Sequence, residues 1–294
     1  MREKLAGSGI EIGEVDPARP LEEQVANASA LIPSMARISA SVIAAAPLLK
    51  LIAQFGAGLD GVDQAAAAAR GIPVRNVPGA NAQSVAELAL FLMLALARRL
   101  PLHRRTFERR LVGDPPGTEL MGKTLGIVGL GATGRALARI ARATGMEVIA
   151  VRRHPGADAD ADASWVGGPA DLDALLARSA YVSLHVPTSS ETLRMIDAAR
   201  LARMKPTAFL VNVGRGDLVD RAALLDALRS RRIAGAGLDV YWEEPPDPRD
   251  EIFSLDNVVA TPHLGGTTFE SLDRIATRLA ALLKEYLRPD LPRA

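Results

Sequence analysis

The segment Gly129-Leu-Gly-Ala-Thr-Gly134 restricts the fold of this chain more than any other feature. An apolar run, Leu125 to Val128, precedes it and is typical of a buried strand, and Arg135 to Thr144 after it is typical of a helix. A glycine-rich turn between a strand and a helix is the fingerprint of a dinucleotide-binding unit. The glycines alone would be equally compatible with a flexible turn, so the prediction depends on the flanking strand and helix.

The residues within this turn have separate roles in such a unit. Gly129 permits the tight turn, Gly131 lets the backbone approach a pyrophosphate, and Gly134 allows the helix to pack closely on the strand. The amides of Ala132 and Thr133 at the start of the helix then face the phosphates. We therefore expect these five residues to bind a dinucleotide cofactor.

The residues after the second strand bear on which dinucleotide binds. Glu147 to Val151 is predicted to be that strand, and Arg152 and Arg153 follow it where an NAD-selective site carries Asp or Glu. Guanidinium groups can hold the 2′-phosphate of NADP through charge-assisted hydrogen bonds. We expect NADP(H) to be preferred to NAD(H). The alternative is that the arginines face solvent and that NAD also binds.

Alternating apolar runs and helical segments predict an α/β protein. Further strands are expected at residues 181–186, 208–213, 235–239 and 258–260, which gives a doubly wound parallel sheet. With 294 residues the chain can form two cores. We place a dinucleotide-binding domain at residues 96–267 and a smaller α/β domain at residues 1–95 plus 268–294. The long apolar helix expected from Gln83 to Arg99 would bridge them.

Composition and spacing argue against several other classes of function. A net charge of +1 and an aromatic content of 4% do not favour nucleic-acid binding. No cysteine is present, and no two histidines have the spacing of metal ligands, so no metal is expected. The longest apolar stretch, Val85 to Ala97, contains Glu87 and is too short to span a membrane. We expect a cytoplasmic protein that binds neither nucleic acid nor membrane.

Three ionisable residues each follow a predicted strand in the second half of the chain. They are Arg215 in VNVGRGD, Glu244 in LDVYWEEPP and His263 in TPHLGG. The carboxyl ends of parallel strands form the edge where such sheets bind ligands, so the three residues are expected to converge. A cation for a carboxylate, a proton donor and an adjacent hydride source are what reduction of a 2-keto acid requires. Singly, each residue could equally be structural, and spacing does not distinguish Glu244 from Glu243.

Taken together, these segments resemble the D-isomer-specific 2-hydroxyacid dehydrogenase family, which includes glyoxylate and hydroxypyruvate reductases, D-lactate dehydrogenases and phosphoglycerate dehydrogenases. The resemblance also covers GAGLDGVD from Gly56, NVPGANAQSVAEL from Asn76, GKTLGIVGLGATG from Gly122 and LHVPTSSET from Leu184. It implies a Rossmann domain inserted into a smaller flavodoxin-like domain and a homodimer. It also implies an NAD(P)-dependent oxidoreductase that interconverts a small 2-keto acid and its D-2-hydroxy acid.

The resemblance assigns roles to individual residues of this chain. Arg215 corresponds to the substrate-binding arginine, His263 to the acid/base, and Glu244, which directly precedes Pro245, to the partner of the histidine. The positions that correspond to the substrate site also include Ala57, Gly58 and Met35. Those that correspond to the rest of the cofactor site are His185, Val186, Pro187, Val213, Gly214, Asp239, His263 and Gly265.

The chain departs from the family pattern at positions that bear on the substrate and the fold. Pro33 stands where phosphoglycerate-type members present a phosphate-binding arginine, which favours glyoxylate or hydroxypyruvate. Met1 to Gly9 is predicted to be helix and loop where the family usually opens with a strand. Two alternatives stay open: a phosphoglycerate-type dehydrogenase, and a dinucleotide-sensing protein that resembles the corepressors related to this family and binds cofactor without turnover.

Overall fold

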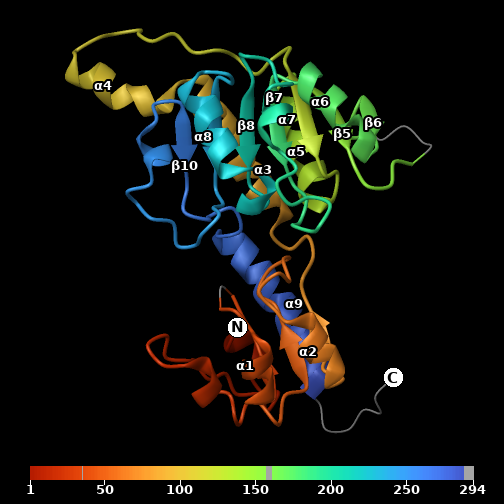
Figure 1. The fold of residues 1–294 in the computed structure, drawn as a ribbon. Helices are drawn as coiled ribbons and strands as arrows, with labels where there is room; N and C mark the ends of the chain where they lie inside the picture. Colours follow the sequence, from red (N-terminus) through yellow and green to blue (C-terminus); the bar gives the residue numbers. More distant parts are fainter. Residues whose placement is uncertain (35, 157–160, 288–294) are drawn as a thin grey trace. The chain divides into compact units, whose positions relative to one another are not determined.

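The computed structural model describes residues 1–34, 36–156 and 161–287, which form two compact units. The smaller unit contains Met1–Asn81 and the described residues from Thr267 onward, and the larger unit is Ala82–Gly266 (Figure 1). The chain therefore divides after Asn81 and not after residue 95 as expected from the sequence. The reason is that helix α3 (Ala82–Ala97) packs against elements of the larger unit along its whole length.

The larger unit is built on a seven-stranded sheet in which every paired strand is parallel. Its spatial order is β10-β9-β8-β7-β4-β5-β6, so the chain winds outward from β4 in both directions. This confirms the doubly wound Rossmann sheet. Strand β6 was not expected, because its three residues carry no apolar run. The strands are β4 (Thr124–Val128), β5 (Glu147–Val151), β6 (Trp165–Gly167), β7 (Tyr181–Leu184), β8 (Phe209–Asn212), β9 (Gly235–Leu238) and β10 (Val258–Ala260).

Helices cover both faces of this sheet, which is why its strands are apolar on both sides. One face packs against α3 and α5, and the other packs against a second set of buried side chains from α6, α7 and α8. The helices and 3-10 turns of this unit, besides α3, are η3 (Leu100–Leu102), α4 (His103–Glu108), α5 (Ala132–Ala143), η4 (Pro169–Asp171), α6 (Leu172–Arg178), α7 (Ala198–Leu201), η5 (Gly216–Leu218), α8 (Arg221–Arg229) and η6 (Glu251–Ser254).

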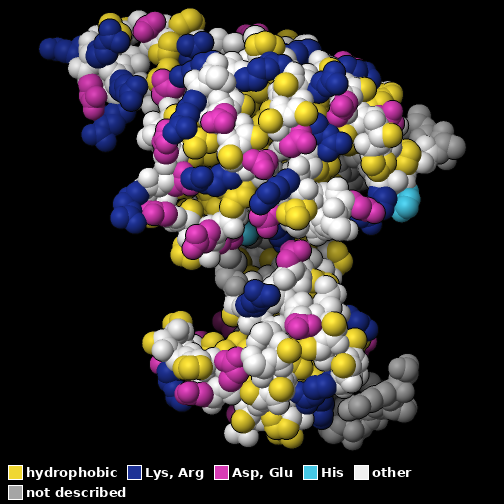
Figure 2. Space-filling view, in the orientation of Figure 1, with side chains coloured by type: hydrophobic (Ala, Val, Ile, Leu, Met, Phe, Trp, Pro, Cys, Tyr) yellow, Lys and Arg dark blue, Asp and Glu magenta, His cyan; other side chains and the backbone are white. Residues whose placement is uncertain are grey.

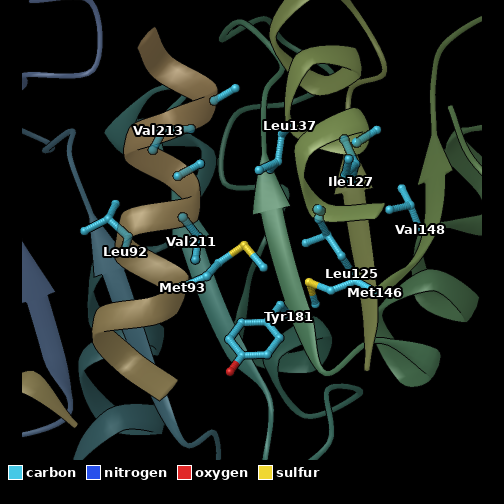
Figure 3. Packing of buried hydrophobic residues seen from close by; sticks show 14 of the residues in the cluster. Leu92, Met93, Leu125, Ile127, Leu137, Met146, Val148, Tyr181, Val211 and Val213 are labelled. Atoms are coloured by element: carbon cyan, nitrogen blue, oxygen red, sulfur yellow. The ribbon is translucent and has the colours of Figure 1, made fainter. Parts of the chain in front are cut away.

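The core beneath α3 and α5 explains the nearly all-round apolar character of α3. Leu92 and Met93 of α3 are inaccessible to solvent and lie in one cluster with Leu125 and Tyr181 of the sheet (Figure 3). Tyr181 also stacks on Phe209, with ring centroids 5.2 Å apart. Because α3 contacts α5 as well as strands β8, β9 and β10, most of its circumference is buried.

The smaller unit contains a three-stranded parallel sheet in the order β1-β2-β3. Buried side chains of α1 and α2 pack on one face of it, and those of α9 pack on the other. Asp63 caps α2 by accepting a hydrogen bond from the amide of Ala66. The elements are η1 (Glu3–Leu5), η2 (Leu21–Glu23), β1 (Ala30–Leu31), α1 (Ala40–Ala44), β2 (Leu51–Ala53), α2 (Gln64–Ala69), β3 (Val74–Arg75) and α9 (Phe269–Leu287).

The amino-terminal segment contains a 3-10 turn and loop, as predicted for Met1 to Gly9. The following residues, Glu11 to Val15, form no backbone hydrogen bond with any described part of the chain. None of the helices in the described ranges has both the length and the apolarity needed to cross a bilayer.

Candidate active site

The glycine turn after β4 has a geometry that only glycine satisfies at two positions. Gly129 has φ +101°, and a Cβ there would lie 2.7 Å from the Val186 side chain and 2.9 Å from the His185 carbonyl. A Cβ on Gly134 would lie 2.2 Å from the carbonyl oxygen of Gly129. The start of α5 is therefore pressed directly against the end of β4.

The amino end of α5 has features that fit a phosphate-bearing dinucleotide. Its N-cap is Gly131, which has no side chain to cap the helix, and the first amides of the helix, from Ala132 and Thr133, precede the first intrahelical donor, Arg135. A Cβ on Gly131 would meet no atom within 4 Å, so the space in front of this residue is open. The positive end of the helix dipole and its amides are thus available to an anionic group.

The arginines after β5 lie at the same carboxyl edge of the sheet as the glycine turn. Arg152 is half-buried, and its amide donates a hydrogen bond to the carbonyl of Gly167 (3.0 Å). Arg153 is exposed, and its guanidinium forms an ion pair with Glu191 at 2.8 Å. Both side chains therefore follow the strand whose end would lie near the ribose of a bound dinucleotide.

The segment after β7 contains three expected cofactor-site residues, His185, Val186 and Pro187. The amide of His185 donates to the carbonyl of Val128, which joins this segment to the end of β4. The imidazole Nε2 lies 2.8 Å from the Ser183 hydroxyl, and burial lowers the pKa of His185 to about 4. His185 is therefore neutral near pH 7 and is suited to a lining role and not to proton donation.

Arg215 lies in a turn between β8 and α8 that side-chain hydrogen bonds stabilise. The Asn212 side chain spans this turn, because its amide donates to the carbonyl of Arg215 (2.7 Å) and its oxygen accepts from the amide of Gly214 (3.1 Å). The Arg215 guanidinium donates to the carbonyl of Gly214 (2.7 Å). A Cβ on Gly216 would lie 2.1 Å from the carbonyl of Tyr241, so the turn also packs on the segment after β9. Val213 is buried beneath it.

Asn212 and Gly216 are structural supports that the sequence reasoning missed. Both lie in the VNVGRGD segment that identified Arg215, where an Asn followed by closely spaced glycines is typical of a tight turn. That pattern could have identified them.

Glu244, and not Glu243, is the residue that contacts His263. The Glu244 Oε2 lies 2.7 Å from His263 Nδ1, and its Oε1 accepts a hydrogen bond from the amide of Tyr241 at 3.1 Å. Both carboxylate oxygens are therefore engaged, which fixes the carboxylate against one nitrogen of the imidazole. The sequence spacing could not make this choice, because the two glutamates are adjacent.

Each member of the pair favours the charged form of the other. Partial burial opposes ionisation of Glu244, but the hydrogen bonds from His263 and from the Tyr241 amide outweigh it and lower the pKa of this carboxyl. The hydrogen bond to Glu244 raises the pKa of His263, although partial burial and the positive charge of Arg215 oppose this. The imidazolium form of His263 is thus stabilised to higher pH than in an isolated histidine.

The loop that carries His263 is organised by a buried carboxylate. His263 has φ +53°, an uncommon value for a residue other than glycine. Asp239, which is 1% exposed, accepts hydrogen bonds from the hydroxyl of Thr261 (2.6 Å) and from the amides of Leu264 and Gly265 (both 2.8 Å). Asp239 therefore closes the loop around His263. Asp239 was expected in the cofactor site, but its contacts with this loop were not evident from the sequence.

The expected substrate-site residues of the smaller unit lie in the loop after β2, apart from Met35, which falls outside the described residues. Gly56 has φ +131°, and the Asn76 side chain donates to the carbonyl of Ala57 at 2.5 Å. Among the described residues, no acceptor contacts the amides of Ala57 and Gly58. These amides are therefore available to an anionic group. No described group of three His, Cys, Asp or Glu side chains could hold a metal ion.

Comparison with known protein families identifies the chain. Residues 90–265 match the family model described as "D-isomer specific 2-hydroxyacid dehydrogenase, NAD binding domain". The chain belongs to this family. A nicotinamide dinucleotide is therefore the cofactor class, and small keto and hydroxy acids are the substrate class.

The curated relatives in this dehydrogenase family are named for different substrates. The chain is 40% identical to a glyoxylate reductase of Thermococcus litoralis over 94% of its own length and 87% of that protein. It is 42% identical to a D-3-phosphoglycerate dehydrogenase of Mycobacterium tuberculosis over 93% of its own length, but it spans only 52% of that longer protein.

Solved structures of the family include complexes with either cofactor. A D-lactate dehydrogenase from Aquifex aeolicus, in complex with NAD and lactic acid, has a TM-score of 0.86 and 28% identity, and the match covers 98% of this chain and 92% of that one. An NADPH-dependent glyoxylate/hydroxypyruvate reductase from Sinorhizobium meliloti, in complex with NADP and malonate, has a TM-score of 0.79 and 33% identity, with 89% and 81% covered.

Proposed function

We propose that this dehydrogenase reduces a small 2-keto acid, such as glyoxylate or hydroxypyruvate, to its D-2-hydroxy acid and prefers NADPH. The observation that carries the proposal is the Glu244 and His263 pair, which is hydrogen-bonded at 2.7 Å in the same unit as the uncapped glycine turn. The names of the Thermococcus and Sinorhizobium relatives support the substrate class. Arg152 and Arg153 directly follow Val151, where an NAD-selective site would carry Asp or Glu, and they support the cofactor preference.

In the proposed reaction, the charged residues bind the substrate and transfer a proton. A bound nicotinamide supplies the hydride that the keto carbon receives. The Arg215 guanidinium binds the carboxylate and polarises the carbonyl. His263 donates a proton from Nε2 to the carbonyl oxygen, because its Nδ1 is committed to Glu244. In the oxidative direction, neutral His263 accepts the hydroxyl proton.

Two alternatives make different predictions in one assay. NADPH and NADH oxidation would be followed at 340 nm with glyoxylate, hydroxypyruvate, pyruvate and 3-phosphohydroxypyruvate. We expect faster oxidation of NADPH with one of the small unphosphorylated acids. A preference for the phosphorylated acid would instead support a phosphoglycerate-type dehydrogenase. Cofactor binding without oxidation by any keto acid would support a dinucleotide-sensing protein. In such a protein Arg215, Glu244 and His263 would have no catalytic role.

The pH dependence of reduction is expected to change when Glu244 is replaced by glutamine. Reduction requires protonated His263, so kcat/KM falls as the pH rises through the pKa of this residue. Glu244→Gln removes the negative charge and the hydrogen-bond acceptor that raise this pKa, so the fall should occur at lower pH than in the wild type. Glu243→Gln is the matched control, because it removes the same charge from the adjacent residue and should leave the profile in place. Coincident profiles for the wild type and Glu244→Gln would contradict the partnership.

We also propose that the protein is a homodimer, with α3 and the segment after it in the interface. Phe91 and Leu94 of α3 are 47% and 43% exposed, and Phe107 and Val112 are 80% and 97% exposed. Large apolar side chains with this much exposure are typical of surfaces that a partner covers. Sedimentation equilibrium should give twice the protomer mass, and Phe107→Glu with Val112→Glu should reduce it toward one protomer. A wild-type protein of one protomer mass would refute the proposal.

A further inference from the structure

The ion pair between Arg153 and Glu191 joins two segments on either side of the glycine turn. Arg153 follows β5, and Glu191 lies in the loop after β7. In the sheet, β7 and β5 are the two neighbours of β4, from which the glycine turn emerges. The 2.8 Å contact therefore links the carboxyl ends of the two strands that flank the expected dinucleotide site.

Glu191 is presented by a turn that has its own hydrogen bonds. The amide of Ser189 donates to the Thr192 hydroxyl (2.8 Å), and that hydroxyl donates to the carbonyl of Pro187 (2.7 Å). The amide of Glu191 itself lies 3.3 Å from the Ser189 hydroxyl. The position of the Glu191 backbone is thus fixed by its own loop and does not depend on Arg153.

We propose that Glu191 is a specificity-determining residue that competes with the 2′-phosphate of NADP(H) for the guanidinium of Arg153. This inference rests on the proposed NADP preference. Because a carboxylate and a phosphate bind a guanidinium through the same donors, a phosphate that uses this face of Arg153 must first displace Glu191. A cofactor without the 2′-phosphate leaves the ion pair intact. Glu191 therefore weakens NADP(H) binding and moderates the preference that the arginines create.

The expected effect is moderate because the pair is exposed. The side chains of Arg153 and Glu191 are 61% and 72% exposed, and exposed ion pairs are weak and sensitive to salt. Glu191→Gln should therefore tighten binding of a 2′-phosphorylated ligand by about twofold to fivefold at low ionic strength. The gain should diminish as salt is added.

The test uses two fragments of the cofactor, adenosine 2′,5′-bisphosphate and adenosine 5′-monophosphate, in calorimetric titrations of the complete protein. Glu191→Gln should bind the bisphosphate more tightly and the monophosphate as the wild type does. Glu251→Gln is the matched control, because it removes the same charge from another exposed ion pair, with Arg229, and should change neither affinity. Unchanged or weaker binding of the bisphosphate to Glu191→Gln would overturn the inference.

A third variant separates this inference from the proposed cofactor preference. Arg153→Gln should lose affinity for the bisphosphate, and adding Glu191→Gln to it should restore nothing. If Arg153→Gln weakens bisphosphate binding while Glu191→Gln does not strengthen it, competition by Glu191 is refuted and the preference stands. If Arg153→Gln binds both fragments as the wild type does, Arg153 does not contact the 2′-phosphate. In that case both the inference and the role of Arg153 in the preference fail.

Discussion

Replacing His263 with asparagine is expected to lower kcat/KM for keto-acid reduction by about 10²- to 10⁴-fold, the usual contribution of a positioned general acid. Asparagine is the substitution of choice because His263 has φ +53°, a conformation that asparagine adopts more readily than most residues. The Asp239 contacts to Leu264 and Gly265 use main-chain amides, so they should persist in the variant. The measurement is steady-state oxidation of NADPH at 340 nm.

Cofactor binding serves as the control for this variant. Nicotinamide fluorescence should report NADPH binding close to that of the wild type, because the glycine turn and the residues after β5 are unchanged. Turnover by His263→Asn within about threefold of the wild type would exclude His263 as the acid, since even weak general-acid catalysis exceeds that factor.

Replacing Arg215 with lysine is expected to lower kcat/KM by about 10- to 100-fold, mainly through a higher KM for the keto acid. Lysine keeps the positive charge but loses the planar pair of donors that matches a carboxylate. The turn itself should survive, because the Asn212 side chain contacts the main-chain carbonyl of Arg215 and not its guanidinium. Initial rates measured over a range of keto-acid concentrations separate KM from kcat.

Thermal unfolding provides the matching control for Arg215→Lys. Its midpoint should stay near that of the wild type, whereas Asn212→Ala should lower it, because Asn212 is 1% exposed and bonds two main-chain groups of the turn. An unchanged KM for the keto acid in a folded Arg215→Lys variant would show that this residue does not bind the substrate carboxylate.

Much of the larger unit could be predicted from the sequence because its signals are local. The glycine turn requires a strand before it and a helix after it, and both are present at β4 and α5. Arg215, Glu244 and His263 each follow an apolar run, and the parallel order of β8, β9 and β10 places the three runs side by side. The rule that ligand-binding residues follow parallel strands therefore led to Arg215, to His263 and to the adjacent pair Glu243 and Glu244.

The features that residue spacing and local patterns did not reveal depend on contacts between distant segments. The choice of Glu244 over Glu243 depends on which side chain turns toward His263, 19 residues further along the chain. The contacts of Asp239 with the His263 loop span 25 and 26 residues. The domain boundary was misplaced for a similar reason, because an all-round apolar helix such as α3 does not indicate which core surrounds it. Strand β6 is too short for an alternating pattern to mark it.

The discontinuity of the smaller unit has a consequence for biosynthesis. Its core joins Leu51 and Ala53 of β2 to Ile275, Leu279 and Leu283 of α9, residues that the ribosome adds more than 200 positions later. The whole of Ala82–Gly266 is translated in between. During that interval one face of the β1–β3 sheet has no helix packed on it. The larger unit can therefore complete its core before α9 has been synthesised and the core of the smaller unit can form. The residues made first are thus among the last to reach their final packing.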